Sequence, residues 1–366
     1  MASIKEKITH WSYDRQRLGK QASNLIQVLK DVIGVYSTHP SGPLSLFARV
    51  KSFKEDDFYK LDYKQLAFRV PAMRLSIYML DAETAHLAFS AIVPSPSSGY
   101  WEKRYSQPGR KIPKEQYSSL RKKILQFATK PLSATEIKDA AGIPDETIKP
   151  ALNRMAYEGD LLRIGAKSLR SNTLSYVSAR DWAKGKFVRT DSGKALAWLA
   201  EEYLKAFGPA RIKDFQWWAG VTVGRANSAV NTCKTIEIEN GLLLLASDVK
   251  KFESFKIPAK DSIDLLPQWD SYTMGYPSDG RERFVEPEMQ QHIYGKLGAT
   301  GGNALGTVLV NGTAHGSWDF RFEGTKMKIK LYMFEKPSSK IMKNIADHFN
   351  YMGALLKAKN LVLESK

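Results

Sequence analysis

The chain has almost none of the features that mark secreted, metal-binding or membrane proteins. Cys233 is its only cysteine, which excludes a disulfide framework and a cysteine-based zinc site, and its apolar neighbours predict a buried small side chain. The 6 histidines are scattered without ligand spacing, so no metal site is predicted. No apolar run approaches the ~20 residues of a membrane helix. The N-terminus lacks the apolar centre of a signal peptide. We therefore expect an intracellular, cytoplasmic protein with no membrane partner.

Common enzyme signatures are missing as well. The sequence contains no Walker loop, no Gly-x-Ser-x-Gly elbow and no His-Glu-x-x-His pair. Residues 298–302 are rich in glycine, but they precede an expected strand, and we interpret them as a connection and not as a phosphate loop. These absences exclude the P-loop, hydrolase-elbow and zincin classes of enzyme.

Positive charge is abundant and unevenly placed. The chain of 366 residues, long enough for two or three domains, has a formal net charge of +17. The net charge is +7 in residues 1–113, +5 in 114–180, +4 in 181–260 and +1 in 261–366. A generally lysine-rich composition would spread the excess more evenly. The gradient favours phosphate binding by the first two-thirds of the chain, with a nearly neutral C-terminal part packed against it.

Residues 132–164 have the pattern helix, tight turn, helix and strand. Ser133 can cap the first helix, and Glu136 completes a capping box three residues later. Gly142 ends this helix, and the second helix has apolar residues at helical spacing. Such a helix commonly enters a DNA major groove, although the same motif can serve protein contact alone. The candidate DNA-binding residues on this helix and on the following wing are Lys149, Asn153, Arg154, Lys167 and Arg170.

Two further segments repeat this order of elements. In residues 192–247 we expect helices over 194–207, 212–219 and 223–232, followed by a strand over 237–245. The last of these helices carries the candidate DNA-binding residues Arg225 and Asn227, whereas Trp217 and Trp218 fit a hydrophobic core better than base stacking. In residues 10–93 the expected elements are helices over 18–32, 44–50, 56–61 and 81–92 and a two-stranded wing over 66–79.

The character of the chain changes after residue 261. Residues 302–310 and 312–322 alternate like the strands of a hairpin, with Asn311 and Gly312 as its turn. A strand over 326–334 and an amphipathic helix over 339–357 follow. The predicted fold is therefore α+β, with three tandem winged-helix units and a C-terminal antiparallel β-rich region that ends in a helix. The predicted boundaries are 1–93, a linker at 94–113, 114–180, 181–260 and 261–366.

Four separated segments resemble one known family. The segments RVPAMRLSIYML, GPARIKDFQWWAGV, LLPQWDSYTMGY and GTVLVNGTAHGSWDFR are similar, in this order, to the AlkZ/YcaQ group of winged-helix DNA glycosylases. The resemblance implies three tandem winged helices that cradle duplex DNA, excision of N-alkylated purines or unhooking of crosslinks, and no metal or organic cofactor. It also implies nucleoid association, and a tandem array of this kind can bind DNA as a monomer.

The resemblance also identifies a candidate catalytic segment. The family motif is Gln-x-Gln or Gln-x-Asp in the loop after the first long helix, and the matching positions here are Tyr36, Ser37 and Thr38, followed by His39. Both catalytic amide or carboxylate side chains are therefore absent. Arg74 falls in the Met-Arg motif of the family, where it would contact DNA or brace the loop. Asp270 is a further charged candidate, with a structural turn as the alternative.

Chemistry allows two interpretations of the altered motif. An N7- or N3-alkylated purine is cationic and leaves without strong acid catalysis, so an enzyme needs mainly to stabilise an oxocarbenium-like sugar and position a water. A neutral His39 can accept the proton of that water, Thr38 can orient it and Tyr36 can stack on a base. Alternatively, the segment is a capping loop and the chain is a non-catalytic DNA-binding regulator or lesion protector. A protein–protein scaffold is a third class, and it predicts no salt-dependent DNA affinity.

Overall fold

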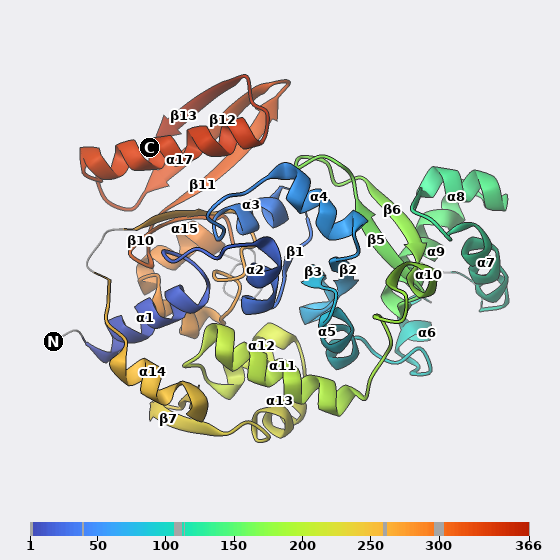
Figure 1. Ribbon diagram of the computed structural model, residues 1–366, viewed down its shortest axis with the longest axis horizontal. Helices are drawn as coiled ribbons and strands as arrows, with labels where there is room; N and C mark the ends of the chain where they lie inside the picture. Colours follow the sequence, from blue (N-terminus) through green and yellow to red (C-terminus); the bar gives the residue numbers. More distant parts are fainter. Residues whose placement is uncertain are drawn as a thin grey trace.

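The computed structural model describes residues 3–38, 40–105, 112, 114–258, 262–295 and 304–365. These residues form a mixed α+β fold with three β-sheets, of six, five and two strands. In Figure 1 the C-terminal sheet and its helix lie on one side of the molecule, and residues 114–180 form a lobe at one end of the long axis. None of the described helices is long and apolar enough to cross a membrane.

A six-stranded sheet joins the first two predicted units. Its strand order is β1-β3-β2-β5-β6-β4, where β2 (Ala67–Pro71) and β3 (Ile77–Asp81) are the first wing, and β5 (Leu161–Gly165) and β6 (Leu174–Ser178) are the second. Two short strands, β1 (Val35–Tyr36) and β4 (Leu132–Ser133), form its edges. The wings were expected to be separate, but β2 pairs with β5 at Arg69 and Arg163. The segment with the candidate motif is therefore one edge of a sheet that also contains the second unit.

The first unit begins later than its pattern suggests. The helix expected over 18–32 is present only as α2 (Leu25–Asp31), because the Asn24 side chain accepts a hydrogen bond from the backbone of Gln27 and caps the helix there. The other helices are α3 (Ser41–Phe47), α4 (Glu55–Tyr63) and α5 (Ala85–Ile92). The preceding helix α1 (Ile4–Arg15) packs against the third unit, where Arg15 donates to the carbonyl oxygen of Lys205.

The second unit follows its sequence pattern closely. Helices α7 (Lys114–Phe127), α8 (Ala134–Ala141) and α9 (Asp145–Glu158) precede the β5–β6 hairpin. Ser133 and Glu136 form the expected capping box, and Gly142 ends α8 with a φ of 60°. That left-handed conformation carries little cost only for glycine, which explains why the turn forms at this residue.

The predicted linker at 94–113 contains a helix in its described part. It contains α6 (Tyr100–Tyr105), in which Trp101 and Tyr105 are buried. The Trp101 indole N–H donates a hydrogen bond to the carbonyl oxygen of Pro94, and its ring contacts that of Tyr157 on α9. The connection therefore packs against the second unit.

The third unit has the same order of helices. A short helix α10 (Ala179–Ala183) leads into α11 (Ser192–Phe207), α12 (Ile212–Ala219) and α13 (Val223–Val230). The single strand expected over 237–245 is instead a hairpin of β7 (Thr235–Glu239) and β8 (Leu242–Leu245) with positive φ at Asn240 and Gly241. Helix α14 (Val249–Ser254) follows the hairpin. Helix α11 packs along α5, and this contact joins the third unit to the first.

The C-terminal region is a five-stranded sheet covered by one helix. Strands β9 (Ile263–Leu266), β10 (Gly306–Val310), β11 (Thr313–Glu323) and β12 (Lys326–Met333) pair antiparallel, and Asn311 and Gly312 form the predicted turn with positive φ. The expectation of a terminal helix in a purely antiparallel region is wrong. Helix α17 (Ser339–Leu355) is followed by β13 (Asn360–Ser365), which pairs parallel to β12. Because α17 crosses the sheet between these two strands, it buries its apolar face, including Phe349, against Trp318.

A fully buried ion pair connects the first unit to the segment after β9. The Arg49 guanidinium donates to both carboxylate oxygens of Asp270, at 2.7 and 2.6 Å, and neither side chain is exposed. Asp270 also accepts hydrogen bonds from the Ser45 hydroxyl (2.7 Å) and the Tyr272 backbone N–H (2.9 Å). All of these contacts are internal, so Asp270 has the structural role that the sequence offered as an alternative.

We expect Asp270→Asn to destabilise the protein by about 3–5 kcal/mol, because it leaves the buried Arg49 charge without its counter-charge. Chemical denaturation would measure the loss. The matched control is Asp139→Asn, whose side chain is 65% exposed and whose replacement should change stability by less than about 0.5 kcal/mol. Equal stability of the two variants would contradict the role assigned to the pair.

Candidate functional site

The backbone of the candidate catalytic segment is held on both sides. Tyr36 ends strand β1, and the Ser37 N–H donates to the carbonyl oxygen of Ile77 on β3 (3.0 Å). The Ser37 carbonyl accepts from Arg69 Nη1 (2.9 Å), and the Thr38 carbonyl accepts from the Gly42 N–H (2.8 Å). The side chains of Tyr36, Ser37 and Thr38 are half-buried, and His39 lies outside the described residues.

Helix α3 approaches this segment so closely that residue 42 has to be glycine. A Cβ atom on Gly42 would lie 2.5 Å from the carbonyl oxygen of Tyr36. The contact fixes the start of α3 against the edge of the sheet. The ion pair of Arg49 with Asp270 then fixes the end of the same helix.

Aromatic rings surround the Tyr36 side chain. Its ring centroid is 5.0 Å from that of Tyr78 and 5.8 Å from that of Trp269, which is nearly parallel to it at 30°. The Tyr36 hydroxyl donates to Ser76 Oγ (2.6 Å). Trp269 has a φ of 59°, which is strained for a bulky residue and persists because the adjacent Asp270 is anchored. We name Tyr36, Tyr78 and Trp269 the aromatic triad.

Arg74 connects the aromatic triad to the third unit. It lies at the tip of the β2–β3 turn, where both Arg74 (φ 54°) and Leu75 (φ 56°) adopt left-handed conformations. Burial raises the pKa of the Tyr78 hydroxyl, and the nearby charge of Arg74 opposes that rise. The guanidinium carbon of Arg74 lies 4.3 Å from the ring centroid of Trp217 on α12. Gly220 makes this approach possible, because a Cβ atom there would lie 2.9 Å from Arg74 Cγ. Arg74 therefore braces the turn, and its guanidinium is held next to the triad.

A second arginine, from a distant part of the chain, contacts the same indole ring of Trp217. The guanidinium carbon of Arg281, in the 3₁₀ helix η3 (Ser278–Arg283), lies 5.5 Å from the ring centroid of Trp217 and 3.6 Å from that of Tyr294. Arg281 is fully buried. Burial and the nearby charge of Arg74 hold the pKa of Arg281 below its usual range.

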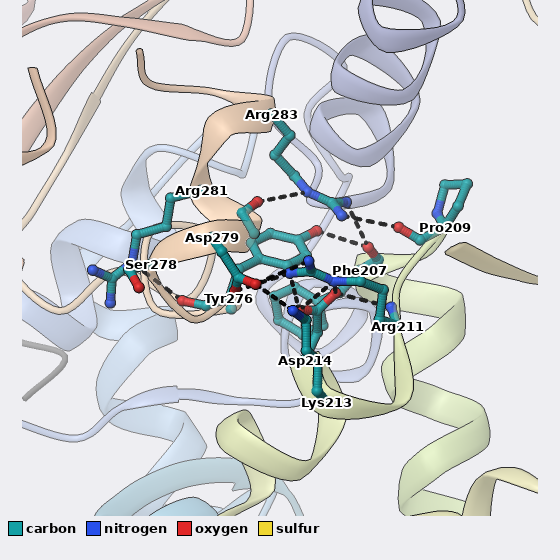
Figure 2. A network of polar contacts seen from close by, with 12 residues as sticks. Phe207, Pro209, Arg211, Lys213, Asp214, Tyr276, Ser278, Asp279, Arg281 and Arg283 are labelled. Atoms are coloured by element: carbon teal, nitrogen blue, oxygen red, sulfur yellow. Dashed lines mark hydrogen bonds and ion pairs between the residues drawn. The ribbon is translucent and has the colours of Figure 1, made fainter. Parts of the chain in front are cut away.

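A polar network fixes η3 to the third unit (Figure 2). The Arg211 guanidinium donates to Asp214 (2.7 Å) and to Asp279 (3.1 Å), and Lys213 also pairs with Asp279. Arg283 donates to the carbonyl oxygens of Phe207 (3.2 Å) and Pro209 (3.0 Å). The network orders the segment on both sides of Arg281, and it thereby positions that side chain against Trp217.

Arg154 is not available to DNA. Its side chain is buried, pairs with Glu158 at 2.8 Å and lies over the Tyr117 ring at 3.7 Å. Arg154 and Glu158 are four residues apart and therefore lie on one side of α9, and the contact with Tyr117 shows that this side faces α7. The expectation that Arg154 contacts DNA therefore does not hold in this structure.

The other predicted DNA-binding residues on helices reach the surface to different degrees. Lys149 and Asn153 on α9 are exposed, and Asn153 Oδ1 accepts a hydrogen bond from the buried Arg163 (3.0 Å). Arg225 on α13 is exposed and donates to the carbonyl oxygen of Ala91 (2.8 Å), and Asn227 is half-buried. These positions lie on two different lobes and not in one cluster with Tyr36.

The tip of the second wing touches two other parts of the molecule. Lys167 is exposed, and its Nζ lies 5.0 Å from the ring centroid of Tyr63. Arg170 lies 3.5 Å from the ring centroid of Phe322 and donates to the carbonyl oxygen of Gly324 (3.3 Å). The wing thus closes against the first unit and the C-terminal sheet, while both cations stay at the surface.

Sequence reasoning missed most of the side chains around Tyr36. Tyr78 and Trp269 lie in two of the segments that resemble the family, but nothing in those segments or around Arg281 separates the three from ordinary core residues. Trp217 packs on the edge of the core and is half-buried between the two arginines, whereas Trp218 is buried as expected. Two features point to the site only in retrospect: Arg74 in a tight turn, and a glycine at position 220 that ends a helix.

Comparisons with known proteins agree with this architecture. The solved structure of the Streptomyces sahachiroi DNA glycosylase AlkZ superposes with a TM-score of 0.76 at 15% sequence identity, over 99% of this chain and 100% of that chain. At this identity the likeness shows the fold alone. No curated protein sequence matches the chain.

A family model settles the relationship. The model described as "DNA glycosylase AlkZ-like" matches residues 30–355, which include the candidate catalytic segment, the aromatic triad, both arginines and every strand of the C-terminal sheet except β13. Because the match covers most of the chain, the protein belongs to the AlkZ-like DNA glycosylase family.

Proposed function

We propose that the protein is a monofunctional DNA repair glycosylase that hydrolyses the N-glycosidic bond of N-alkylated purines, or of crosslinked purines, in duplex DNA. Family membership supports the glycosylase activity and DNA binding. The observation that carries the proposal is the aromatic triad at the positions of the family's catalytic segment, with the charge of Arg74 beside it.

The proposed DNA-binding frame is three tandem winged helices. The arrangement of three helices and a hairpin in residues 114–178 and again in 192–245 supports the second and third units. The hairpin of β2 and β3, together with α2, α3 and α4, supports the first. In this frame the helices act mainly by holding the phosphate backbone, and the chemistry takes place at residues 36–39.

The aromatic triad suits a cationic base. An N7- or N3-alkylated purine carries a positive charge, and the electron-rich faces of Tyr36 and Trp269 attract such a ring more strongly than a neutral base. The base becomes neutral when it leaves, so its departure needs little assistance from the protein. Thr38 would then orient the attacking water, and a neutral His39 would accept its proton.

The competing function is DNA binding without catalysis. Tyr36 and Thr38 replace the amide or carboxylate side chains of the family motif, and a tyrosine whose hydroxyl is bonded to Ser76 cannot take over as a base. On this alternative the triad holds a damaged base and protects it. Excision of the base separates the two functions directly.

We expect the protein to release N7-methylguanine from duplex DNA, detected as strand cleavage by alkali at the abasic site. His39→Ala should lower the single-turnover rate about 10²-fold or more, because a general base contributes typically 10²–10⁴-fold. His348→Ala is the matched control, since His348 is exposed on α17 and should have no effect. If the wild-type protein binds DNA but releases no alkylated base, the non-catalytic alternative is correct. Unchanged excision by His39→Ala would remove that residue from the mechanism.

Binding to DNA should weaken steeply with salt, because protein cations displace counterions from the phosphates. We expect Lys149→Ala to reduce the slope of log affinity against log salt by about one, measured by fluorescence anisotropy with duplex DNA. Lys359→Ala serves as the control, because Lys359 is exposed in the nearly neutral C-terminal part. Affinity that does not depend on salt would contradict the whole DNA-binding proposal and favour a protein scaffold.

A further inference from the structure

The Trp217 ring contacts two guanidinium groups from distant parts of the chain. Arg74 comes from the turn between β2 and β3 and Arg281 from η3, at 4.3 and 5.5 Å from the same ring system. The Arg74 contact depends on two backbone features, the left-handed turn at Arg74 and the close approach of Gly220 to it. The molecule is therefore built to hold two like charges next to each other.

This arrangement is costly unless something negative joins it. Arg281 is fully buried, and Arg74 is half-buried. Arg74 forms no ion pair with any described residue, and its Nη2 atom is buried without a hydrogen-bond partner in that part of the chain. At Arg281, a hydrogen bond from Nε to the carbonyl oxygen of Tyr276 (3.2 Å) and the Tyr294 ring offset the desolvation cost. At Arg74, the Trp217 ring offsets part of this cost, and an anion that accepts a hydrogen bond from the buried Nη2 would offset more of it.

Arg74 lies close to the candidate catalytic segment. Its charge acts on the hydroxyl of Tyr78, whose ring lies 5.0 Å from that of Tyr36. Arg74 and Trp217 are only half-buried, so part of this pair is open to an anion from solution. A guanidinium matches the oxygens of a phosphate in a bidentate geometry.

We propose that Arg74 and Arg281 form a phosphate-binding site, with Arg74 in direct contact and Arg281 supplying the second charge. The site holds a phosphodiester of the DNA next to the nucleotide that stacks on the aromatic triad. This inference rests on the proposed function for its DNA, but the phosphate chemistry of the site does not depend on catalysis. Arg74 thereby positions the DNA strand relative to Tyr36 without contacting the base edges that carry the DNA sequence.

The first test replaces single phosphates of a lesion-containing duplex with neutral methylphosphonates. A methylphosphonate at one position next to the lesion should weaken binding by the wild-type protein about 10-fold or more, because one charge-assisted hydrogen bond is lost. The Arg74→Gln variant should bind the unmodified duplex more weakly by a similar factor. A methylphosphonate at that position should not weaken its binding further, whereas methylphosphonates at other contacted positions still should. Arg74→Lys keeps the charge and should recover part of the response. If Arg74→Gln responds to every position as the wild type does, Arg74 contacts no phosphate and only braces the turn.

The second test uses inorganic phosphate alone. At constant ionic strength, phosphate should raise the melting temperature of the wild-type protein relative to chloride, and this increase should be absent in Arg74→Gln. Arg180→Gln is the matched control, because the Arg180 side chain is 92% exposed, and it should keep the increase. An equal increase in all three proteins would overturn the proposal.

The two tests separate this inference from the glycosylase activity. A position-specific methylphosphonate effect without base release would sustain the phosphate site and reject the enzyme. A phosphate-dependent melting temperature without any DNA affinity would assign the site to free phosphate and reject the DNA-strand role. Base release with no difference between wild type and Arg74→Gln in either test would reject the phosphate site and leave the enzyme in place.

Discussion

The buried ion pair between Arg49 and Asp270 is the interaction on which the candidate site depends. Two charges removed from water gain little net stability, but once buried they restrict the chain to arrangements in which both remain paired. Arg49 follows α3, and Asp270 follows Trp269, so the pair brings the helix behind the catalytic segment and the indole beside it into one unit. The strained backbone of Trp269 is tolerated because its neighbour cannot move.

From that anchor, the site extends across three parts of the chain. The aromatic triad belongs to the edge of the six-stranded sheet and to the segment after β9, Arg74 belongs to the first wing, and Trp217 belongs to the third unit. Figure 1 shows β1, β3 and α12 near the middle of the molecule and helices α7 and α8 of the second unit at one end of it. Contacts between units therefore shape the site, and the continuous packing of α5 against α11 maintains it.

The chain departs from the catalytic pattern of its family but keeps a chemically suitable environment. Tyr36 and Thr38 stand where amide or carboxylate side chains are expected, yet the surroundings provide aromatic faces for a cationic base and positive charge for a phosphate. A cationic leaving group lowers the demand on acid catalysis, so binding and positioning gain importance over proton transfer. Such an environment serves an alkylpurine glycosylase and a lesion-binding protein equally well, and base release distinguishes them.

Local patterns in the sequence specify the individual helices and turns of this protein. Ser133 with Glu136 and the glycine at position 142 specify the second unit, and Asn311 with Gly312 specifies the hairpin, because caps and turns depend on neighbouring residues. The sequence also shows the basic character of the first two-thirds of the chain and, through the family resemblance, the position of the candidate catalytic segment. Four other features depend on long-range contacts. The two wings share a sheet, and β13 adds a parallel strand to the C-terminal one. Arg154 is buried, and Trp217 contacts both Arg74 and Arg281. These outcomes arise from contacts between residues far apart in the chain, for which no local spacing exists.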